Sequence, residues 1–427
     1  MLSQPWRKCG AIYSCNVIGG SGLSNSNFDP KLGHGVLKII WRLHFARRWA
    51  LIEPTSKNKP RLGHCDLAQG GSTSGQNNEP QGDASMLTLI DTLRQIQGDR
   101  LGRLGLGPTE CRYRIVATGA RWRLRAYVDT SAGTPLLIVA APIKRPYIWD
   151  LAYSVSVVRH CLQNRLHLYL LEWMAPSRSD KDAGLGYYAT RSIGEAVATV
   201  ARQAGGKTPL VMGHSLGGTL AAIFAAFDPP SIRGLVLLST PLCFAPGSCR
   251  FRDAIVAMTP PNPAAMEIVP GSLLSQLSVM ASPETFLWSR LVDLVLSAGD
   301  PEAWMVHARV ERWSLDEFPL PGRLVHEILA WLYRDNRLCA GTLRIGERIL
   351  GPSSLQVPLL AVVNTADAVA PPRSIVPFIA AMPGGYTRLV EYPGEAGVGL
   401  QHLAILVGRQ AHATVWPNII SWLHSHA

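Results

Sequence analysis

The sequence predicts an α/β fold in which a mostly parallel, doubly wound sheet carries an inserted helical cap. From Pro135 onward, short and nearly continuous apolar runs alternate with helical stretches, which is the pattern of a parallel sheet covered on both faces. Between residues 242 and 353 the alternation stops, and Pro-rich turns and helical segments that carry aromatic residues replace it. A segment of this kind between two strands favours a cap inserted into the sheet's connections.

The expected elements follow in chain order. Polar and apolar residues alternate over Arg112–Thr118 and Arg121–Val128, across a short Gly-Ala turn, and this predicts a hairpin. Strands are expected at six apolar runs: Leu136–Ala140, Leu168–Leu171, Leu210–Met212, Leu235–Leu238, Val357–Val363 and Arg388–Tyr392. Helices are expected between them, over Ile148–Gln163, Tyr187–Ala204, Leu216–Phe227, Ser374–Ala381 and Leu403–His424.

Residues 1–85 differ in composition from the rest of the chain. They end in a polar, Gly-rich tract, Gln69–Ser85, which is predicted to be disordered or a linker. After Met86, apolar residues recur at helical spacing and predict an amphipathic helix that ends near Gly98: Leu87, Leu89, Ile90, Leu93 and Ile96. We therefore divide the chain into an extension, residues 1–85, and a domain, residues 86–427.

The charge of the chain does not indicate a nucleic-acid partner. The net charge is +11, but residues 1–85 hold ten Lys/Arg and five Asp/Glu and so supply +5 of it. The remaining positive charge is spread over the rest of the chain, with no Lys/Arg run and no basic stripe interleaved with aromatic residues. We interpret it as solubilising charge with weak affinity for anionic surfaces or substrates.

The eight cysteines are scattered, and no CxxC pair or His/Cys cluster has the spacing of zinc ligands. A chain of this size does not need disulfides, so reduced thiols and no bound metal are expected. No stretch reaches about 18 uncharged apolar residues, which argues against a membrane span. The first residues are a poor match to a signal peptide, and a cytoplasmic location is expected.

The strongest chemical signal is the pentapeptide Gly213-His-Ser-Leu-Gly217, which follows an apolar run and leads directly into a helix of small residues. In a sharp strand-to-helix turn, glycines avoid clashes and the serine Oγ points into a cleft. Ser215 is therefore the expected nucleophile, and the Leu216 amide at the helix start is an expected oxyanion donor. The alternative is a serine with a structural role only. This setting is typical of the α/β-hydrolase fold.

A serine nucleophile needs a base and an acid, and this fold supplies them later in the chain, in the order Ser, Asp, His. Asp367 follows a buried strand and precedes a helix, although a turn or N-cap aspartate would look the same. His402 lies between the last strand and the last helix, as the base should. The other C-terminal histidines are interpreted as surface residues: His412, His424 and His426.

Three further positions near the nucleophile can be assigned. His214 is adjacent to Ser215 but points elsewhere from the turn, so we expect it to pack or to line the cleft. The second oxyanion amide should come from the loop after the first core strand, near Ile143. Gly217 and Gly218 are explained by the turn and not by nucleotide binding, and the chemistry needs no metal or organic cofactor.

From about residue 86 to residue 427 the chain resembles the polyhydroxyalkanoate synthases and their close α/β-hydrolase relatives. The matching stretches are Ala141–Leu151, Leu168–Trp173, Gly217–Ile223, Leu235–Pro241, Glu311–Trp313, Tyr333–Leu338 and Gly341–Gly346, with the contexts of Asp367 and of His402 up to Leu423. The resemblance implies a triad of Ser215, Asp367 and His402. It also implies substrates that are hydroxyacyl chains, carried by coenzyme A or as polyester.

The chain departs from this family at the nucleophile, where the synthases have Cys and this chain has Ser215. A thiolate exchanges one thioester for another at little cost, whereas a serine forms a more stable oxoester that is open to water. The family's acidic cluster after the Trp173 strand is replaced by Gly184–Tyr188, and the Gly before the catalytic His by Gln401.

These departures favour a serine hydrolase or acyltransferase that acts on hydroxyacyl esters or thioesters. A polyhydroxyalkanoate synthase that polymerises hydroxyacyl-coenzyme A is the first alternative. The second alternative is a granule-associated binding protein with weak catalysis, which the aromatic-rich cap and the mild positive charge favour. A polymer-granule surface and a second copy of the chain stay open as partners.

The abrupt change of pattern at Met86 suggests that translation begins at or near this residue. The alternative is a genuine but flexible extension over residues 1–85. N-terminal sequencing or intact-mass measurement of the native protein separates the two, with a product that starts near Met86 expected. A native product that starts at Met1 would contradict this hypothesis.

Overall fold

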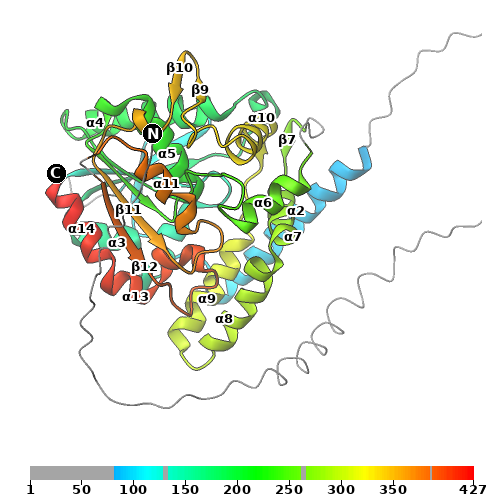
Figure 1. The fold of residues 1–427 in the computed structure, drawn as a ribbon. Helices are drawn as coiled ribbons and strands as arrows, with labels where there is room; N and C mark the ends of the chain where they lie inside the picture. The colour runs from blue at the N-terminus through cyan, green and yellow to red at the C-terminus, as the bar shows by residue number, and fades with distance from the viewer. Residues whose placement is uncertain (1–80, 128–132, 261–265, 385–386) are drawn as a thin grey trace, which may run out of the picture. The chain divides into compact units, whose positions relative to one another are not determined.

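A computed structural model describes residues 81–127, 133–260, 266–384 and 387–427 (Figure 1). These residues belong to one compact unit, Asn77–Ala427. Most of the polar tract expected from Gln69 onward, and Val128 at the end of the hairpin, lie outside the described residues. None of the helices in the described part of the chain has the length and apolar character needed to cross a membrane.

The core is an eight-stranded sheet with the order β1-β2-β4-β3-β5-β6-β11-β12. Its strands are β1 (Tyr113–Thr118), β2 (Trp122–Tyr127), β3 (Pro135–Val139), β4 (His167–Trp173), β5 (Leu210–His214), β6 (Gly234–Leu238), β11 (Leu359–Asn364) and β12 (Thr387–Tyr392). The pairs β1–β2 and β2–β4 are antiparallel, and the other five pairs are parallel. The predicted hairpin and six strands are confirmed, with ends that move by no more than two residues.

The inner strands β3, β5, β6 and β11 are buried on both faces of the sheet, which explains why they are almost continuously apolar. Leu137 and Val139 of β3 point into one hydrophobic core, and Leu136 and Ile138 point into the other. The first core is covered by α4 (Ile193–Gln203), α5 (Ser215–Phe227) and α11 (Val376–Ala380). The second is covered by α3 (Val157–Gln163), α12 (Ala404–Val407), α13 (Arg409–Thr414) and α14 (Trp416–Ser425). The doubly wound arrangement is confirmed.

The segment between β6 and β11 forms the expected helical cap. Its helices are α6 (Arg250–Met258), α7 (Gly271–Ala281), α8 (Ser289–Ser297), α9 (Pro301–Ser314) and α10 (Gly322–Glu327). Four short strands accompany them: β7 (Ile268–Val269), β8 (Leu320–Pro321), β9 (Leu343–Ile345) and β10 (Arg348–Leu350). Figure 1 shows α6 to α9 gathered beside one end of the sheet, next to α2 (Gln81–Leu101).

Helix α2 begins earlier than the sequence pattern predicts, and more of its apolar side chains are exposed to solvent. It starts at Gln81, so the end of the tract expected to be a linker belongs to the helix, and it runs to Leu101 instead of ending near Gly98. Leu93 is 56% exposed, because α2 packs on α7 and α9 of the cap through other residues. One of these contacts is polar: Asp91 Oδ1 accepts a hydrogen bond of 2.9 Å from Ser272 N.

The helix predicted over Ile148–Gln163 is shorter than expected, since only Val157–Gln163 is α-helical. Asp150 accepts a hydrogen bond from the Ser156 hydroxyl, and these two residues also form a β-bridge that the helical pattern does not foresee. The Ser156 Oγ accepts a hydrogen bond of 2.9 Å from Arg159 N and thereby caps α3. The buried carboxylate of Asp150 therefore decides where the helix can start.

The helix predicted over Leu403–His424 is broken into α12, α13 and α14. The first break is at Gly408, whose backbone is extended with φ −81° and ψ 128°. Glu395 accepts hydrogen bonds from the backbone amides of Gln410 (2.8 Å) and Ala411 (2.9 Å), so it satisfies the free amides at the start of α13. A carboxylate from a preceding loop thus replaces the continuous helix.

The cysteines also differ from the expectation of reduced thiols. Cys243 and Cys339 form a disulfide, with Cα atoms 5.0 Å apart and a sequence separation of 96. Cys243 is buried and follows β6, whereas Cys339 lies near the end of the cap. The spacing of the cysteines in the sequence did not indicate this pair, because the two residues meet only when the chain returns from the cap to the sheet. Cys111, Cys161 and Cys249 are free.

Replacing Gly217 with Ala is expected to destabilise the protein. A Cβ at this position would lie 2.4 Å from the Val139 carbonyl oxygen and 2.8 Å from Ala141 N, and these backbone atoms cannot move aside as a flexible side chain could. We expect a loss of about 1–3 kcal/mol in the free energy of unfolding, measured by urea denaturation. Gly299→Ala is the control, because a Cβ there has open space. Equal stability of the two variants would contradict the close packing.

Candidate active site

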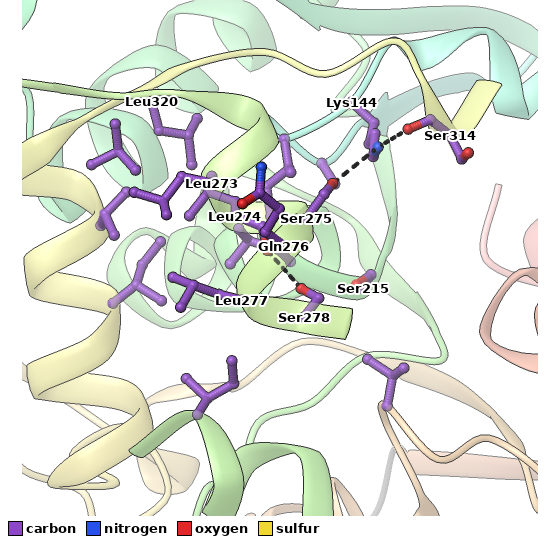
Figure 2. A pocket seen from close by; sticks show the side chains of 18 of the residues that line it. Lys144, Ser215, Leu273, Leu274, Ser275, Gln276, Leu277, Ser278, Ser314 and Leu320 are labelled. Carbon is purple, nitrogen blue, oxygen red and sulfur yellow. Dashed lines mark hydrogen bonds between the residues drawn. The ribbon is translucent and has the colours of Figure 1, made fainter. Parts of the chain in front are cut away.

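The expected nucleophile lies on a tight turn between β5 and α5. Strand β5 ends at His214 and α5 starts at Ser215, so no residue separates them. Ser215 has a φ of 54°, a left-handed backbone conformation that costs a non-glycine residue about 1–3 kcal/mol. Gly213 and Gly217 allow the turn, because a Cβ at either would lie within 2.5 Å of neighbouring backbone atoms. The turn exposes the Ser215 side chain to a cavity (Figure 2).

The structure brings Ser215, His402 and Asp367 into one hydrogen-bonded chain. Ser215 Oγ lies 2.7 Å from His402 Nε2, and His402 Nδ1 lies 2.7 Å from Asp367 Oδ2. Asp367 follows β11 and His402 follows β12, and both strands run parallel to β5. The carboxyl ends of parallel strands meet at one edge of the sheet, which is why residues so far apart in sequence converge.

Asp367 is suited to hold the imidazole in place. Its Oδ1 accepts hydrogen bonds from Val369 N (2.8 Å) and Ala370 N (3.0 Å), which leaves Oδ2 for His402. Burial by itself would raise the pKa of Asp367, but the attraction of His402 and these hydrogen bonds hold it below its ordinary value. The carboxylate therefore stays ionised and can stabilise a positively charged imidazole.

His214 has a role that the sequence only partly indicated. It lines the cavity, as expected, and its Nε2–H donates to the backbone oxygen of His402 at 2.8 Å. Its ring also meets the Trp149 ring edge-on, with centroids 6.4 Å apart. Burial and the neighbouring His402 lower the pKa of His214 to about 3, so its ring is neutral. A neutral donor supports the base without adding a competing charge.

Leu216 and Ile143, the expected oxyanion donors, both lie on the wall of the cavity that contains Ser215. The loop of Ile143 is held from two sides. Trp173 Nε1 donates to the Ala140 oxygen at 2.6 Å, and Phe318 N of the cap segment donates to the Ile143 oxygen at 2.8 Å. The roles of these two amides stay a prediction.

The cavity above Ser215 has a volume of about 1850 Å³. Pockets for drug-sized ligands are usually about 300–1,000 Å³, so this one has room for a long substrate. Much of its wall is apolar and comes from the cap; α7 contributes Leu273, Leu274 and Leu277, close to Ser215 in Figure 2. The cap therefore forms most of the wall of the cavity next to Ser215.

A polar cluster on the same wall was missed by the sequence analysis. Lys144 Nζ donates to Glu317 Oε1 (3.0 Å), to the Ser314 oxygen and to Ser275 Oγ (3.5 Å), as Figure 2 shows in part. Arg94 of α2 also donates to Glu317, at 2.9 Å. Burial lowers the pKa of Lys144 to about 8, although Glu317 opposes the shift. Lys144 lies in a matching stretch, Ala141–Leu151, but only the fold shows its partners.

The surface assignment is wrong for two of the remaining histidines, His412 and His426. His426 is half-buried, and its ring stacks on Trp422 with the ring centroids 4.1 Å apart. His412 is half-buried: its Nε2–H donates to the Leu406 oxygen at 2.9 Å, and its ring stacks on Trp416. Burial lowers the pKa of His412 to about 4. His424 is exposed, as expected. Among the described residues, no group of three or more His, Cys, Asp or Glu side chains is arranged to hold a metal ion.

A family model described as alpha/beta hydrolase fold matches residues 146–396, which is more than half of the 427 residues. The chain belongs to the α/β-hydrolase fold family. It is accordingly an enzyme of the α/β-hydrolase type, and the class of reaction that fold and relatives support is acyl transfer.

The relatives in sequence confirm the resemblance to the polyhydroxyalkanoate synthases. The chain is 28% identical to the Poly(3-hydroxyalkanoate) polymerase subunit PhaC of Haloferax mediterranei over 69% of its own length, but spans only 59% of that protein. It is 25% identical to the protein of the same name from Synechocystis sp., over 79% of this chain and 89% of that one. A structure of the monoglyceride lipase from Saccharomyces cerevisiae is 13% identical, with a TM-score of 0.45 over 75% of this chain and 98% of that one.

His214→Gln is expected to make the protein less sensitive to acid. The native state keeps His214 neutral down to about pH 3, whereas an unfolded chain protonates it near the ordinary pKa of 6.5. The unfolded state therefore binds the proton first, and stability falls as the pH drops below about 6.5. At pH 5 the wild type should have lost about 2 kcal/mol that the variant retains.

The measurement is urea unfolding at pH 8 and pH 5. Gln can still donate to the His402 oxygen, so the comparison isolates the titrating ring. His424→Gln, which removes an exposed imidazole, is the matched control. An equal loss of stability in the wild type and in His214→Gln would contradict the assignment of a buried, neutral His214.

Proposed function

We propose that the chain is a serine hydrolase or acyltransferase that acts on hydroxyacyl esters or thioesters through an acyl-enzyme on Ser215. The observation that carries the proposal is the distance of 2.7 Å from Ser215 Oγ to His402 Nε2, with Asp367 a further 2.7 Å from Nδ1. A serine hydroxyl becomes a nucleophile when a base can accept its proton, and an imidazole becomes that base when a carboxylate orients it.

The proposed reaction has two halves. Ser215 Oγ attacks the acyl carbonyl while His402 Nε2 takes the hydroxyl proton, and Asp367 stabilises the imidazolium. The negative charge on the carbonyl oxygen is bound by the amides of Leu216 and Ile143. His402 then gives the proton to the leaving alcohol or thiol, and the acyl group remains on Ser215. Water, or an alcohol in the acyltransferase case, attacks this ester by the same steps in reverse and frees Ser215.

The substrate class rests on two supports. The relatives are named Poly(3-hydroxyalkanoate) polymerases, so hydroxyacyl chains are the natural acyl groups to test. The cavity of about 1850 Å³ has an apolar wall for the carbon chain, and Lys144 and Ser275 make part of the same wall polar. An extended hydroxyacyl chain has both kinds of surface.

Hydrolysis is favoured over polymerisation because the nucleophile is an oxygen. Chain growth requires that the bound chain passes rapidly to the next hydroxyl group, and a serine oxoester is a poorer donor than a thioester. The polymerase names of the relatives favour the alternative of a synthase. The exposed apolar side chains of α8, among them Val295 at 73%, favour the alternative of a protein that binds a polymer granule.

Ser215→Ala is expected to lower the rate of hydrolysis of a short-chain p-nitrophenyl ester by at least about 1,000-fold, because it removes the nucleophile. Ser353→Ala, at an exposed serine, is the control and should keep the wild-type rate. Release of p-nitrophenol measures the reaction. Full activity of Ser215→Ala would refute the assignment of the nucleophile.

The same wild-type preparation, given 3-hydroxybutyryl-coenzyme A, should release free 3-hydroxybutyrate and coenzyme A. Polymer as the main product would instead support the synthase alternative, and no product of either kind would support the granule-binding alternative. Ser215→Cys separates the chemistry from the scaffold. It should lower ester hydrolysis and raise the share of polymer relative to free acid, since a thioester passes its acyl group on more readily.

A further inference from the structure

The segment between β12 and His402, residues 393–401, has an unusual backbone, and we refer to it as the base loop. Three of its residues are glycines with left-handed φ values: Gly394 at 81°, Gly397 at 83° and Gly399 at 72°. Since other residues adopt such values only with strain, the glycines permit a loop shape that the contacts described below then hold in place. It carries His402 at its end, so its shape determines where the imidazole lies.

One carboxylate of the cap binds the middle of this loop. Asp293 belongs to α8 and is buried, with 7% of its surface exposed. Its Oδ1 accepts hydrogen bonds from Gly397 N (2.7 Å) and Val398 N (3.4 Å), and its Oδ2 accepts one from Gly399 N (2.7 Å). His307 of α9 lies 2.8 Å from the same Oδ2 through its Nδ1. Four donors thus converge on a single side chain.

The cap also fits closely against the loop in the same place. A Cβ at Gly397 would lie 2.8 Å from the Cβ of Ala303, and a Cβ at Gly399 would lie 2.9 Å from Cγ1 of Val310. Both neighbours belong to α9. Because there is no space between the loop and α9, a shift of the cap cannot leave the loop where it is.

On its other side the base loop is held by the sheet domain. Gln401 Nε2 donates to the Glu395 oxygen at 2.6 Å, and Glu395 N donates to Gln401 Oε1 at 3.2 Å. Asn364, the last residue of β11, donates from its Nδ2 to the Gln401 oxygen at 2.8 Å. Gln401, a departure from the resembling family, therefore braces the loop from within, while Asp293 holds it from the cap.

We propose that Asp293 is a positioning residue through which the cap sets the orientation of the base His402. Asp293 acts through the backbone of the base loop and touches neither substrate nor Ser215. The inference rests on the proposed function in that His402 must act as a base. Its structural part, that the cap holds the histidine in line with Asp367 and Ser215, can be tested without catalysis.

The charge of Asp293 is required for this role. Burial by itself would raise the pKa of Asp293, but the hydrogen bonds from His307 and from the loop amides hold it below its ordinary value. An ionised carboxylate accepts on both oxygens, and hydrogen bonds to a charged acceptor are the stronger ones. Asn at this position has the same size but only one acceptor oxygen, and its NH₂ group would face a loop amide. The loop would lose at least one of its two short contacts.

Asp293→Asn is the decisive variant, made in the full chain and assayed on the p-nitrophenyl ester. We expect kcat to fall about 10- to 100-fold, because a misplacement of about 1 Å in a catalytic group has effects of that size, while KM stays within about twofold. Asp300→Asn is the matched control. Asp300 also links the cap to the C-terminal segment, through Arg409 of α13, but it does not contact the base loop. This control should keep the wild-type kcat.

A spectroscopic measurement separates positioning from a general loss of structure. The proton on His402 Nδ1, hydrogen-bonded to Asp367, should give a downfield ¹H NMR signal that Asp367→Asn removes. In Asp293→Asn this signal should weaken or shift, with near-ultraviolet circular dichroism unchanged, whereas in Asp300→Asn it should persist. If Asp293→Asn does not fold, His307→Phe, which has no N–H to donate to the Asp293 carboxylate, should cause a smaller change in the same direction.

The results that test the role of Asp293 differ from the results that test the proposed hydrolase function. A wild-type kcat and an unchanged His402 signal in Asp293→Asn would overturn the proposal, whatever the substrate. If Asp293→Asn does not fold, the same two results in His307→Phe would overturn it. A wild type that hydrolyses neither substrate would refute the proposed function, and the His402 signal would then decide alone about Asp293. A parallel loss of kcat in Asp293→Asn and Asp300→Asn would also overturn the proposal, since it would show a general effect of loosening the cap.

Discussion

The turn at Ser215 is the constraint on which the rest of the site depends. A strand passes directly into a helix there, with a left-handed residue at the junction. Such a conformation persists only where the surroundings enforce it, and here Gly217 lies against the end of β3 at a distance that excludes a side chain. The buried parallel sheet supplies that rigidity, because both of its faces are packed. Ser215, the proposed nucleophile, is thus held by the same core that stabilises the fold.

Around this turn, the charge state of each buried ionisable group depends on the partners that offset the cost of its burial. Asp367 is buried but stays ionised because His402 and two backbone amides offset the cost of burying it. His214 is equally buried and has no carboxylate of its own, so it stays neutral and serves as a hydrogen-bond donor. The rings of these two histidines, with centroids only 4.7 Å apart, therefore have different roles. His402 is the proposed base, and His214 holds the backbone of His402 in position.

The cap contributes more than a cover over the cavity. Through Glu317 it engages Lys144 in the loop after β3, next to the expected oxyanion residue Ile143, and through Asp293 it engages the base loop. Arg94 of α2 joins the first of these clusters, so the helix that precedes the sheet also reaches the cavity wall. The cap thus contacts both loops that flank the nucleophile. A movement of the cap would therefore change both loops at once.

The sequence by itself determined the local features: the strands, since runs buried on both faces are continuously apolar, and the nucleophile turn, since its glycines are required by contacts within a few residues. Asp367 and His402 could be chosen because the order of strands restricts where an acid and a base can lie. The tertiary structure alone decided the features that join distant segments. Asp150 binds the Ser156 hydroxyl that caps α3, and Glu395 accepts hydrogen bonds from the first amides of α13, so both carboxylates interrupt predicted helices. Cys243 meets Cys339 across the cap. The partners of Lys144 and Asp293 likewise follow from folding. The sequence pattern around a residue indicates whether its side chain is buried, but not which charged group or backbone amide that side chain will contact.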